Sequence, residues 1–166
     1  MQKHDEPSVL QNRALGSFGD LRESRALLGG ALRGKTIAYV VDDRDHHAES
    51  RVLRMGVFEG VGASEKSSVL KYSEFFDGKA TEADVLVLRS SRLFPYRIPE
   101  LELALKRFRA ENPKSAVILC VFDPCAERAV MQLAETGVVN LIDDNPPNDF
   151  ELLRKASAVL ERLASE

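Results

Sequence analysis

Short apolar runs alternate with longer amphipathic segments from Lys35 onward. This alternation is typical of βα units, in which each apolar run forms a strand and each amphipathic segment forms a helix that covers the sheet. The clearest apolar runs are residues 36–41, 84–88, 115–122 and 138–142. With one further run between residues 57 and 70, they predict an α/β domain with a doubly wound, mostly parallel sheet of five strands.

Helices are expected between these strands, where apolar residues recur at intervals of three or four. The expected helices cover residues 45–55, 99–110 and 126–135, and Gly137 can end the third of them. A long final helix is expected after Asn148 or Asp149, either of which can cap it. Its apolar face would consist of Phe150, Leu153, Ala156, Leu160 and Leu163.

The stretch from residue 57 to residue 76 has two interpretations. In the first, residues 57–61 form the second strand and residues 65–76 form a helix, because the apolar residues of the latter have helical spacing. In the second, residues 68–70 form the strand and the helix is vestigial. We favour the first interpretation, although three glycines weaken its strand.

The first 34 residues differ from the rest of the chain. Glycines at positions 16, 19, 29 and 30 lie among several leucines, so any helices there would be short or interrupted. We therefore expect residues 1–34 to be an N-terminal extension, partly helical or flexible, and residues 35–166 to be the folded domain. The extension either packs on the domain or serves as an arm for a partner.

The composition predicts one soluble domain rather than a nucleic-acid-binding or membrane protein. The chain has 166 residues, of which 44% are hydrophobic, and its net charge of −3 provides no field that attracts nucleic acid. No stretch approaches the roughly 20 apolar residues of a membrane span, and the N-terminus lacks the apolar core of a signal peptide. The two cysteines, Cys120 and Cys125, form no disulfide framework. A cytoplasmic location is expected.

Charged residues follow two of the expected strands in an unusual combination. Asp42 and Asp43 come directly after the first strand, whereas Arg89 follows the third. The carboxyl ends of parallel strands open onto one crevice, where ligands of such folds bind. Paired carboxylates can bind a hard cation such as Mg²⁺. An arginine beside them is unsuited to such a site, because its own charge is positive. These three residues are therefore expected to lie close together.

In element order and in its acidic pair, residues 35–161 resemble a response-regulator receiver domain. The resemblance implies a flavodoxin-like fold with helices on both faces of the sheet. It also implies that Asp42 and Asp43 occupy the place of the acids that hold Mg²⁺ in that family. A phosphate-accepting Asp would follow the third strand, a Ser or Thr the fourth, and a Lys the fifth. Each of these groups contacts one phosphoryl group.

The chain departs from this pattern at three strand ends. Arg89 stands in the place of the phosphate-accepting Asp, and a guanidinium cannot act as a nucleophile because it stays protonated. Val121 or Phe122 stands where the hydroxyl is expected. Asp143 and Asp144 stand where the Lys is expected. The implied phosphorylation site is therefore degenerate.

Two roles for Arg89 remain open. It can replace the metal and the phosphate by pairing with Asp42 or Asp43, and with Asp144, since a buried charge needs a partner. Alternatively, it points into water and contributes little.

The resulting prediction is a non-catalytic pseudo-receiver that acts through protein contacts in bacterial-type signal transduction, with no cofactor and with only a vestigial acidic pair at the metal position. Receiver-like domains often use the face that corresponds here to residues 126–163, so a protein partner or a homodimer is expected there, and no nucleic acid or membrane. The alternative is a small-ligand-binding or enzymatic flavodoxin-like domain that uses the crevice around Asp42 and Arg89.

Overall fold

A computed structural model of the chain describes residues 30–79, 82–89, 97–122 and 127–166. Five strands form one sheet in the order β2-β1-β3-β4-β5, and every neighbouring pair is parallel. The strands are β1 (Ile37–Val41), β2 (Ser68–Lys71), β3 (Val85–Arg89), β4 (Ala116–Val121) and β5 (Leu141–Asp144). This order confirms the predicted α/β class and is that of the flavodoxin-like fold.

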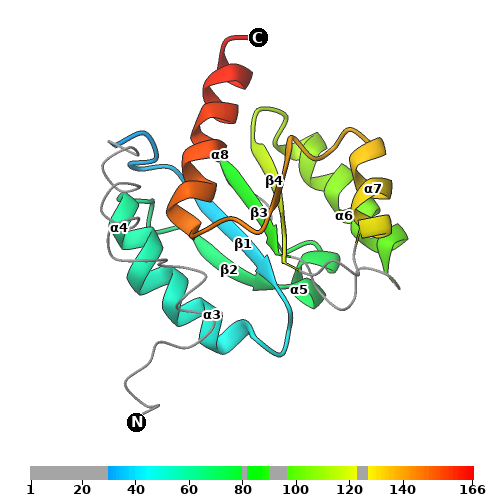
Figure 1. Cartoon of the computed structure of the whole chain (residues 1–166), viewed down its shortest axis with the longest axis horizontal. Helices are drawn as coiled ribbons and strands as arrows, with labels where there is room; N and C mark the ends of the chain where they lie inside the picture. The colour runs from blue at the N-terminus through cyan, green and yellow to red at the C-terminus, as the bar shows by residue number, and fades with distance from the viewer. Residues whose placement is uncertain (1–29, 80–81, 90–96, 123–126) are drawn as a thin grey trace.

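Helices cover both faces of the sheet (Figure 1). One face carries α3 (His46–Val52), the π-helix η2 (Leu53–Phe58), α4 (Glu59–Val61) and α8 (Asp149–Ala164). The other face carries α5 (Tyr72–Phe76), α6 (Ile98–Glu111) and α7 (Glu127–Glu135). Because both faces are covered, β1, β3 and β4 are buried along their whole length, as expected for continuous apolar strands.

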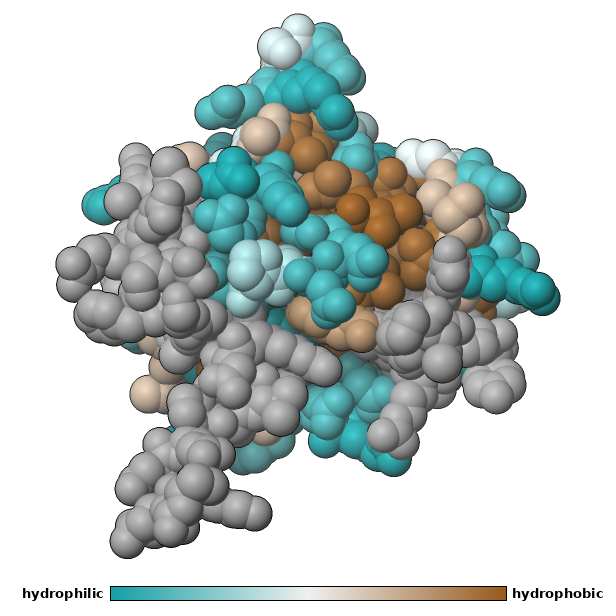
Figure 2. All heavy atoms as spheres, viewed as in Figure 1, coloured by the Kyte–Doolittle hydropathy of each residue, from teal (hydrophilic) through white to brown (hydrophobic). Residues whose placement is uncertain are grey.

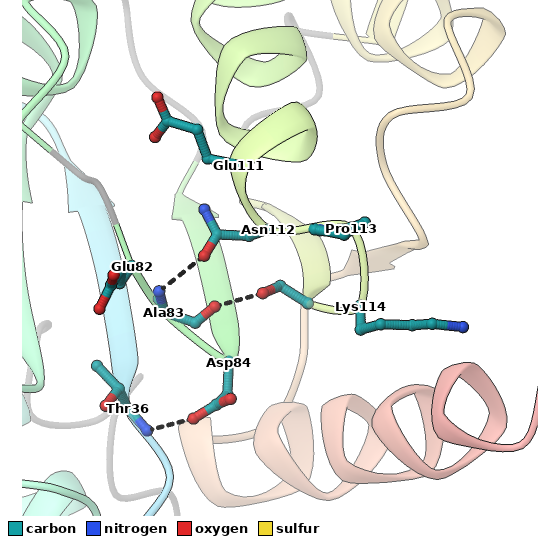
Figure 3. A pocket seen from close by; sticks show the side chains of 9 residues that line it. Thr36, Glu82, Ala83, Asp84, Glu111, Asn112, Pro113 and Lys114 are labelled. Atoms are coloured by element: carbon teal, nitrogen blue, oxygen red, sulfur yellow. Dashed lines mark hydrogen bonds between the residues drawn. The ribbon is translucent and has the colours of Figure 1, made fainter.

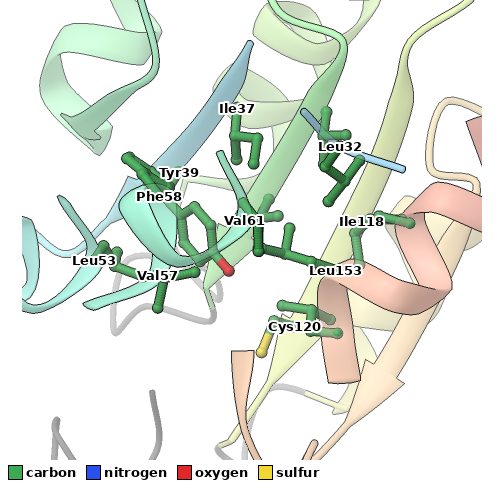
Figure 4. Packing of buried hydrophobic residues seen from close by; sticks show 14 of the residues in the cluster. Leu32, Ile37, Tyr39, Leu53, Val57, Phe58, Val61, Ile118, Cys120 and Leu153 are labelled. Carbon is green, nitrogen blue, oxygen red and sulfur yellow. The ribbon is translucent and has the colours of Figure 1, made fainter. Parts of the chain in front are cut away.

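The core under α3 and α8 is formed by side chains of alternate strand residues (Figure 4). Ile37 in β1 and Ile118 in β4 pack there against Leu53 of η2 and Leu153 of α8. Leu32, which lies in the predicted N-terminal extension, is completely buried in the same cluster. Residues 1–29, on which the rest of that prediction depends, lie outside the described residues.

The favoured interpretation of residues 57–76 is wrong, because α3, η2 and α4 form one helical segment from His46 to Val61. Val57 and Val61 are buried at the helical interval of four, and Gly62 ends the segment in a left-handed conformation with φ of +68°. The second interpretation is confirmed, since β2 covers residues 68–71 and α5 has five residues.

Strand β5 begins three residues later than expected, at Leu141. The side chain of Asn140 accepts a hydrogen bond from the N–H of Val117 at 2.8 Å and another from Arg109. Arg109 also donates to the carbonyl of Val138, so side chains hold this approach to the sheet. The expected cap of the last helix is confirmed, because Asn148 Oδ1 accepts from the N–H of Glu151 at 2.9 Å.

Candidate functional site

The residues predicted to form the site lie at the carboxyl ends of the parallel strands. We call this side of the sheet its carboxyl edge. Arg89 is the last residue of β3 and is in register with Cys120 of β4. Val121 ends β4 and is in register with Asp144 of β5. Asp42 directly follows β1. The expected meeting of these strand ends at one edge is therefore present.

Arg89 points into the interior between the sheet and two helices. Its side chain leaves β3 on the same face as Val85 and Val87, which α3 and α8 cover. The guanidinium donates from Nη1 to Oε1 of Glu49 in α3, and from Nη2 to Oδ2 of Asp149 in α8, the second bond measuring 2.6 Å. The three side chains are at most 5% exposed. Arg89 is thus a buried cation between two buried carboxylates.

Two tyrosines complete this group. Tyr39 in β1 donates its hydroxyl to Oδ1 of Asp149 at 2.7 Å, and its ring centre lies 5.3 Å from the guanidinium carbon of Arg89. Tyr72, the first residue of α5, donates its hydroxyl to the main-chain carbonyl of Arg89. We call Tyr39, Glu49, Tyr72, Arg89 and Asp149 the Arg89 cluster. It ties β1, β3, α3, α5 and α8 together.

The charges of the Arg89 cluster are set by burial and by mutual attraction. Burial disfavours the charged guanidinium, but attraction by Asp149 and Glu49 outweighs it and the pKa of Arg89 is raised. Burial raises the pKa of Glu49 above its ordinary value, and attraction by Arg89 opposes this shift. Burial also raises the pKa values of Tyr39 and Tyr72, so both hydroxyls remain protonated donors at neutral pH.

The predicted partners of Arg89 are wrong, because its guanidinium pairs with Glu49 and Asp149, and its burial also contradicts the alternative in which it points into water. Asp42 Oδ1 accepts from the main-chain N–H of Arg44 at 3.0 Å, and Asp43 Oδ1 accepts from that of Ser73 at 3.2 Å. Asp42 thus bonds the main chain of the loop after β1, and Asp43 bonds the main chain at the start of α5. The alternation of side chains along β3 directs Arg89 to the α3 and α8 face instead.

The ends of β4 and β5 have the character that the sequence indicated. Val121 is buried and offers no hydroxyl. Asp143 is buried and accepts from Nζ of Lys155 in α8 at 3.1 Å, whereas Asp144 is exposed. A lysine therefore contacts this edge of the sheet, but it belongs to α8 and is held by Asp143.

The described residues form no metal centre. They contain no group of three His, Cys, Asp or Glu residues that could hold an ion. Next to the acidic pair, His46 has its Nε2 at 2.7 Å from the carbonyl of Val69, and His47 is exposed. The two histidines are therefore directed to different surroundings, as expected for adjacent residues at the start of a helix.

A hollow of about 380 Å³ lies at the opposite edge of the sheet, where strands begin (Figure 3). Its polar side chains hold the main chain in place. Asp84 accepts from the N–H of Thr36 at 2.9 Å, and Ser115 donates to the carbonyl of Ala83. Asn112 accepts from the N–H of Ala83 at 3.4 Å. These bonds give Asp84, Asn112 and Ser115 a structural role.

Sequence spacing alone does not identify the partners of Arg89. Asp149 has the sequence position of a helix cap, and Tyr39 lies within the apolar run of residues 36–41. Glu49 has a weak sequence signal, since it precedes Leu53 and Val57 at intervals of four and so shares their buried helix face. A charged residue on an otherwise apolar helix face is the pattern that could have predicted a buried partner for Arg89.

No protein-family model matches the chain, and neither a curated protein nor a solved structure is significantly similar to it. The assignment to the flavodoxin-like α/β proteins therefore rests on strand order and direction. Among the described segments, no helix has the length and apolar character needed to cross a membrane.

Replacing Arg89 by methionine is expected to lower the free energy of unfolding by about 3–5 kcal/mol, because two buried carboxylates then lose their cation. Urea denaturation followed by circular dichroism measures this change. The control is Lys106→Met, which removes a lysine that pairs with Glu102 on the surface of α6. Equal stability of the two variants would show that Arg89 contributes no more than an exposed pair.

Replacing Tyr39 by phenylalanine is expected to lower the free energy of unfolding by about 1–3 kcal/mol, because Oδ1 of buried Asp149 loses its donor while the ring remains. The same denaturation experiment measures the loss. A variant as stable as the wild type would mean that another donor replaces the hydroxyl.

Proposed function

We propose that the chain is a pseudo-receiver, a domain that takes no phosphoryl group and acts through contacts with other proteins in bacterial-type signalling. The observation that carries this proposal is the state of Arg89. This residue ends β3, where a receiver domain would have its phosphate-accepting carboxylate. Its guanidinium has no nucleophilic form and is held by Glu49 and Asp149 inside the protein.

The neighbouring strand ends support the same proposal. Val121 offers no hydroxyl to a phosphoryl group, and Asp143 with Asp144 places carboxylates where a cation would be needed. Like charges at this edge would repel a phosphoryl group rather than stabilise it. The chain also shares the strand order of receiver domains. Fold and strand ends together favour a scaffold without the phosphoryl-transfer chemistry.

A small-ligand-binding or enzymatic role for the crevice has weaker support. That alternative needs Arg89 to be free to bind an anion. Two ion pairs to Glu49 and Asp149 take up its charge instead, and the side chain is only 4% exposed. We therefore assign no catalytic role to the Arg89 cluster.

The proposed contact surface lies over the edge strand β5 and the neighbouring sides of α7 and α8. Apolar side chains gather between these two helices (Figure 2). In β5, in the residues before it and in α8, the partly buried apolar side chains are Val139, Leu141, Ile142, Leu160 and Leu163. Met131 of α7, also within residues 126–163, is 56% exposed. Apolar side chains with charged neighbours such as Arg128, Glu135 and Arg162 suit a protein partner, including a second copy of the chain.

The full chain is expected to take up no phosphoryl group when incubated with acetyl phosphate and Mg²⁺, because no accepting carboxylate stands at the end of β3. Intact mass spectrometry measures uptake, and a phosphorylatable receiver domain under the same conditions is the positive control. Stoichiometric gain of a phosphoryl group by the chain would overturn the pseudo-receiver proposal.

Replacing Met131 by glutamate is expected to weaken self-association by about tenfold or more, since a charge would enter an apolar contact. Sedimentation velocity over a range of concentrations measures this effect. The matched control is Leu103→Glu on α6, which alters an apolar side chain that is 68% exposed but lies outside residues 126–163. A wild-type chain that stays monomeric at high concentration would exclude the homodimer and leave a different protein as the partner.

A further inference from the structure

The Arg89 cluster contains more negative than positive charge. Arg89 supplies one positive charge, whereas Glu49 and Asp149 supply two negative charges when both are ionised. Tyr39 and Tyr72 stay neutral because burial raises their pKa values. Water cannot screen the remaining negative charge well, since the three ionisable side chains are almost completely buried. One proton would balance the cluster.

The two carboxylates differ in how well they are stabilised as anions. Asp149 accepts one hydrogen bond on each oxygen, from Tyr39 and from Arg89. Among the described residues, Glu49 accepts from Arg89 alone. A carboxylate that accepts fewer hydrogen bonds is less stabilised in its ionised form and therefore binds a proton more readily. The hydrogen bonds thus select Glu49 as the group that binds the balancing proton.

We propose that Glu49 is a proton-binding site that controls how firmly α3 is held on the sheet. With the proton bound, the cluster consists of a balanced Arg89–Asp149 pair and a neutral carboxyl group that still contacts the guanidinium. Without the proton, an excess negative charge is buried under α3. Exposing Glu49 to water by loosening α3 relieves that charge. Asp149 keeps its two donors in either state, so α8 stays attached.

The charged and titratable groups around Glu49 give the direction of the pH effect. Burial raises its pKa most, Arg89 of β3 opposes this, and Asp45 and Asp149 raise the pKa further. Tyr72 of α5 also senses the charge of Glu49. A pKa raised in the folded state gives stability that is complete below the unfolded pKa, near 4.5, and is lost as pH rises through the folded pKa. Mild acid therefore tightens α3, and neutral pH loosens it.

The position of α3 connects this proton site to the edge of the sheet. Helix α3 begins at His46, shortly after Asp42 and Asp43. A change in how firmly α3 is held therefore reaches the loop that carries the acidic pair. Protonation of Glu49 is expected to leave the surface over β5 and α8 unchanged, because α8 is held through Asp149.

The test compares the full-length wild type with Glu49→Gln, which removes the titrating group but keeps an oxygen for Arg89. Between about pH 4.5 and about pH 8, the unfolding constant of the wild type is expected to rise about tenfold for each unit by which the folded pKa of Glu49 exceeds the unfolded pKa. Glu49→Gln should lack this rise and be more stable than the wild type at the upper end. The matched control is Glu59→Gln, an exposed glutamate in α4, which should keep the wild-type profile.

Amide hydrogen exchange, corrected for intrinsic rates, locates the effect. Protection of α3 should fall with rising pH in the wild type and stay constant in Glu49→Gln, while protection of α8 in the wild type should fall by no more than the change in global stability. If Glu49→Gln does not fold, an NMR titration of the wild-type carboxyl groups decides, with Glu49 expected to titrate above the ordinary value of a glutamate. A wild-type pH profile in Glu49→Gln, equal loss of protection in α3 and α8, or a Glu49 midpoint at or below that ordinary value would overturn the proposal.

Discussion

A buried guanidinium held by two carboxylates is the interaction on which the arrangement of this protein depends. Removing the charge of Arg89 from water is costly unless opposite charges accompany it, and here they come from different helices. Glu49 belongs to α3 and Asp149 to α8, so the cation of β3 sets where both helices lie on the sheet. Tyr39 and Tyr72 add hydrogen bonds to Asp149 and to the main-chain carbonyl of Arg89.

This use of Arg89 gives the carboxyl edge of the sheet a structural role. In flavodoxin-like folds this edge is where ligands usually bind. Here Asp43 bonds the main chain at the start of α5, Asp143 bonds Lys155, and Arg89 is turned inward. In the part of the chain that the structure describes, these three polar groups join secondary structure elements. The contact surface proposed for β5 and α8 does not depend on these groups.

Hydrophobic spacing predicted most elements because each is encoded by neighbouring residues. It failed at Val57 and Val61, whose apolar character suits a strand as well as a helix. In the structure these residues belong to the helical segment, where both are buried against the sheet. The sequence also marked Arg89 as the unusual residue. It could not identify the partners, since Glu49 and Asp149 lie 40 and 60 residues away. Asp42 and Asp43 fit the pattern as partners because the spacing of residues in β3 gives the face on which Arg89 leaves the strand but not which helices cover that face.

The long sequence separation within the Arg89 cluster has a consequence for the order of folding. Asp149 lies 110 residues after Tyr39, so a growing chain exposes β1 and β3 on the ribosome well before the acceptor that Tyr39 and Arg89 share is synthesised. Until then, Glu49 is the only one of its two carboxylate partners that Arg89 can contact, and the incomplete sheet lacks α8, which covers its core. The amino-terminal half therefore cannot complete its core in advance. Long-range pairing of this kind slows folding and makes the last helix the step that commits the chain.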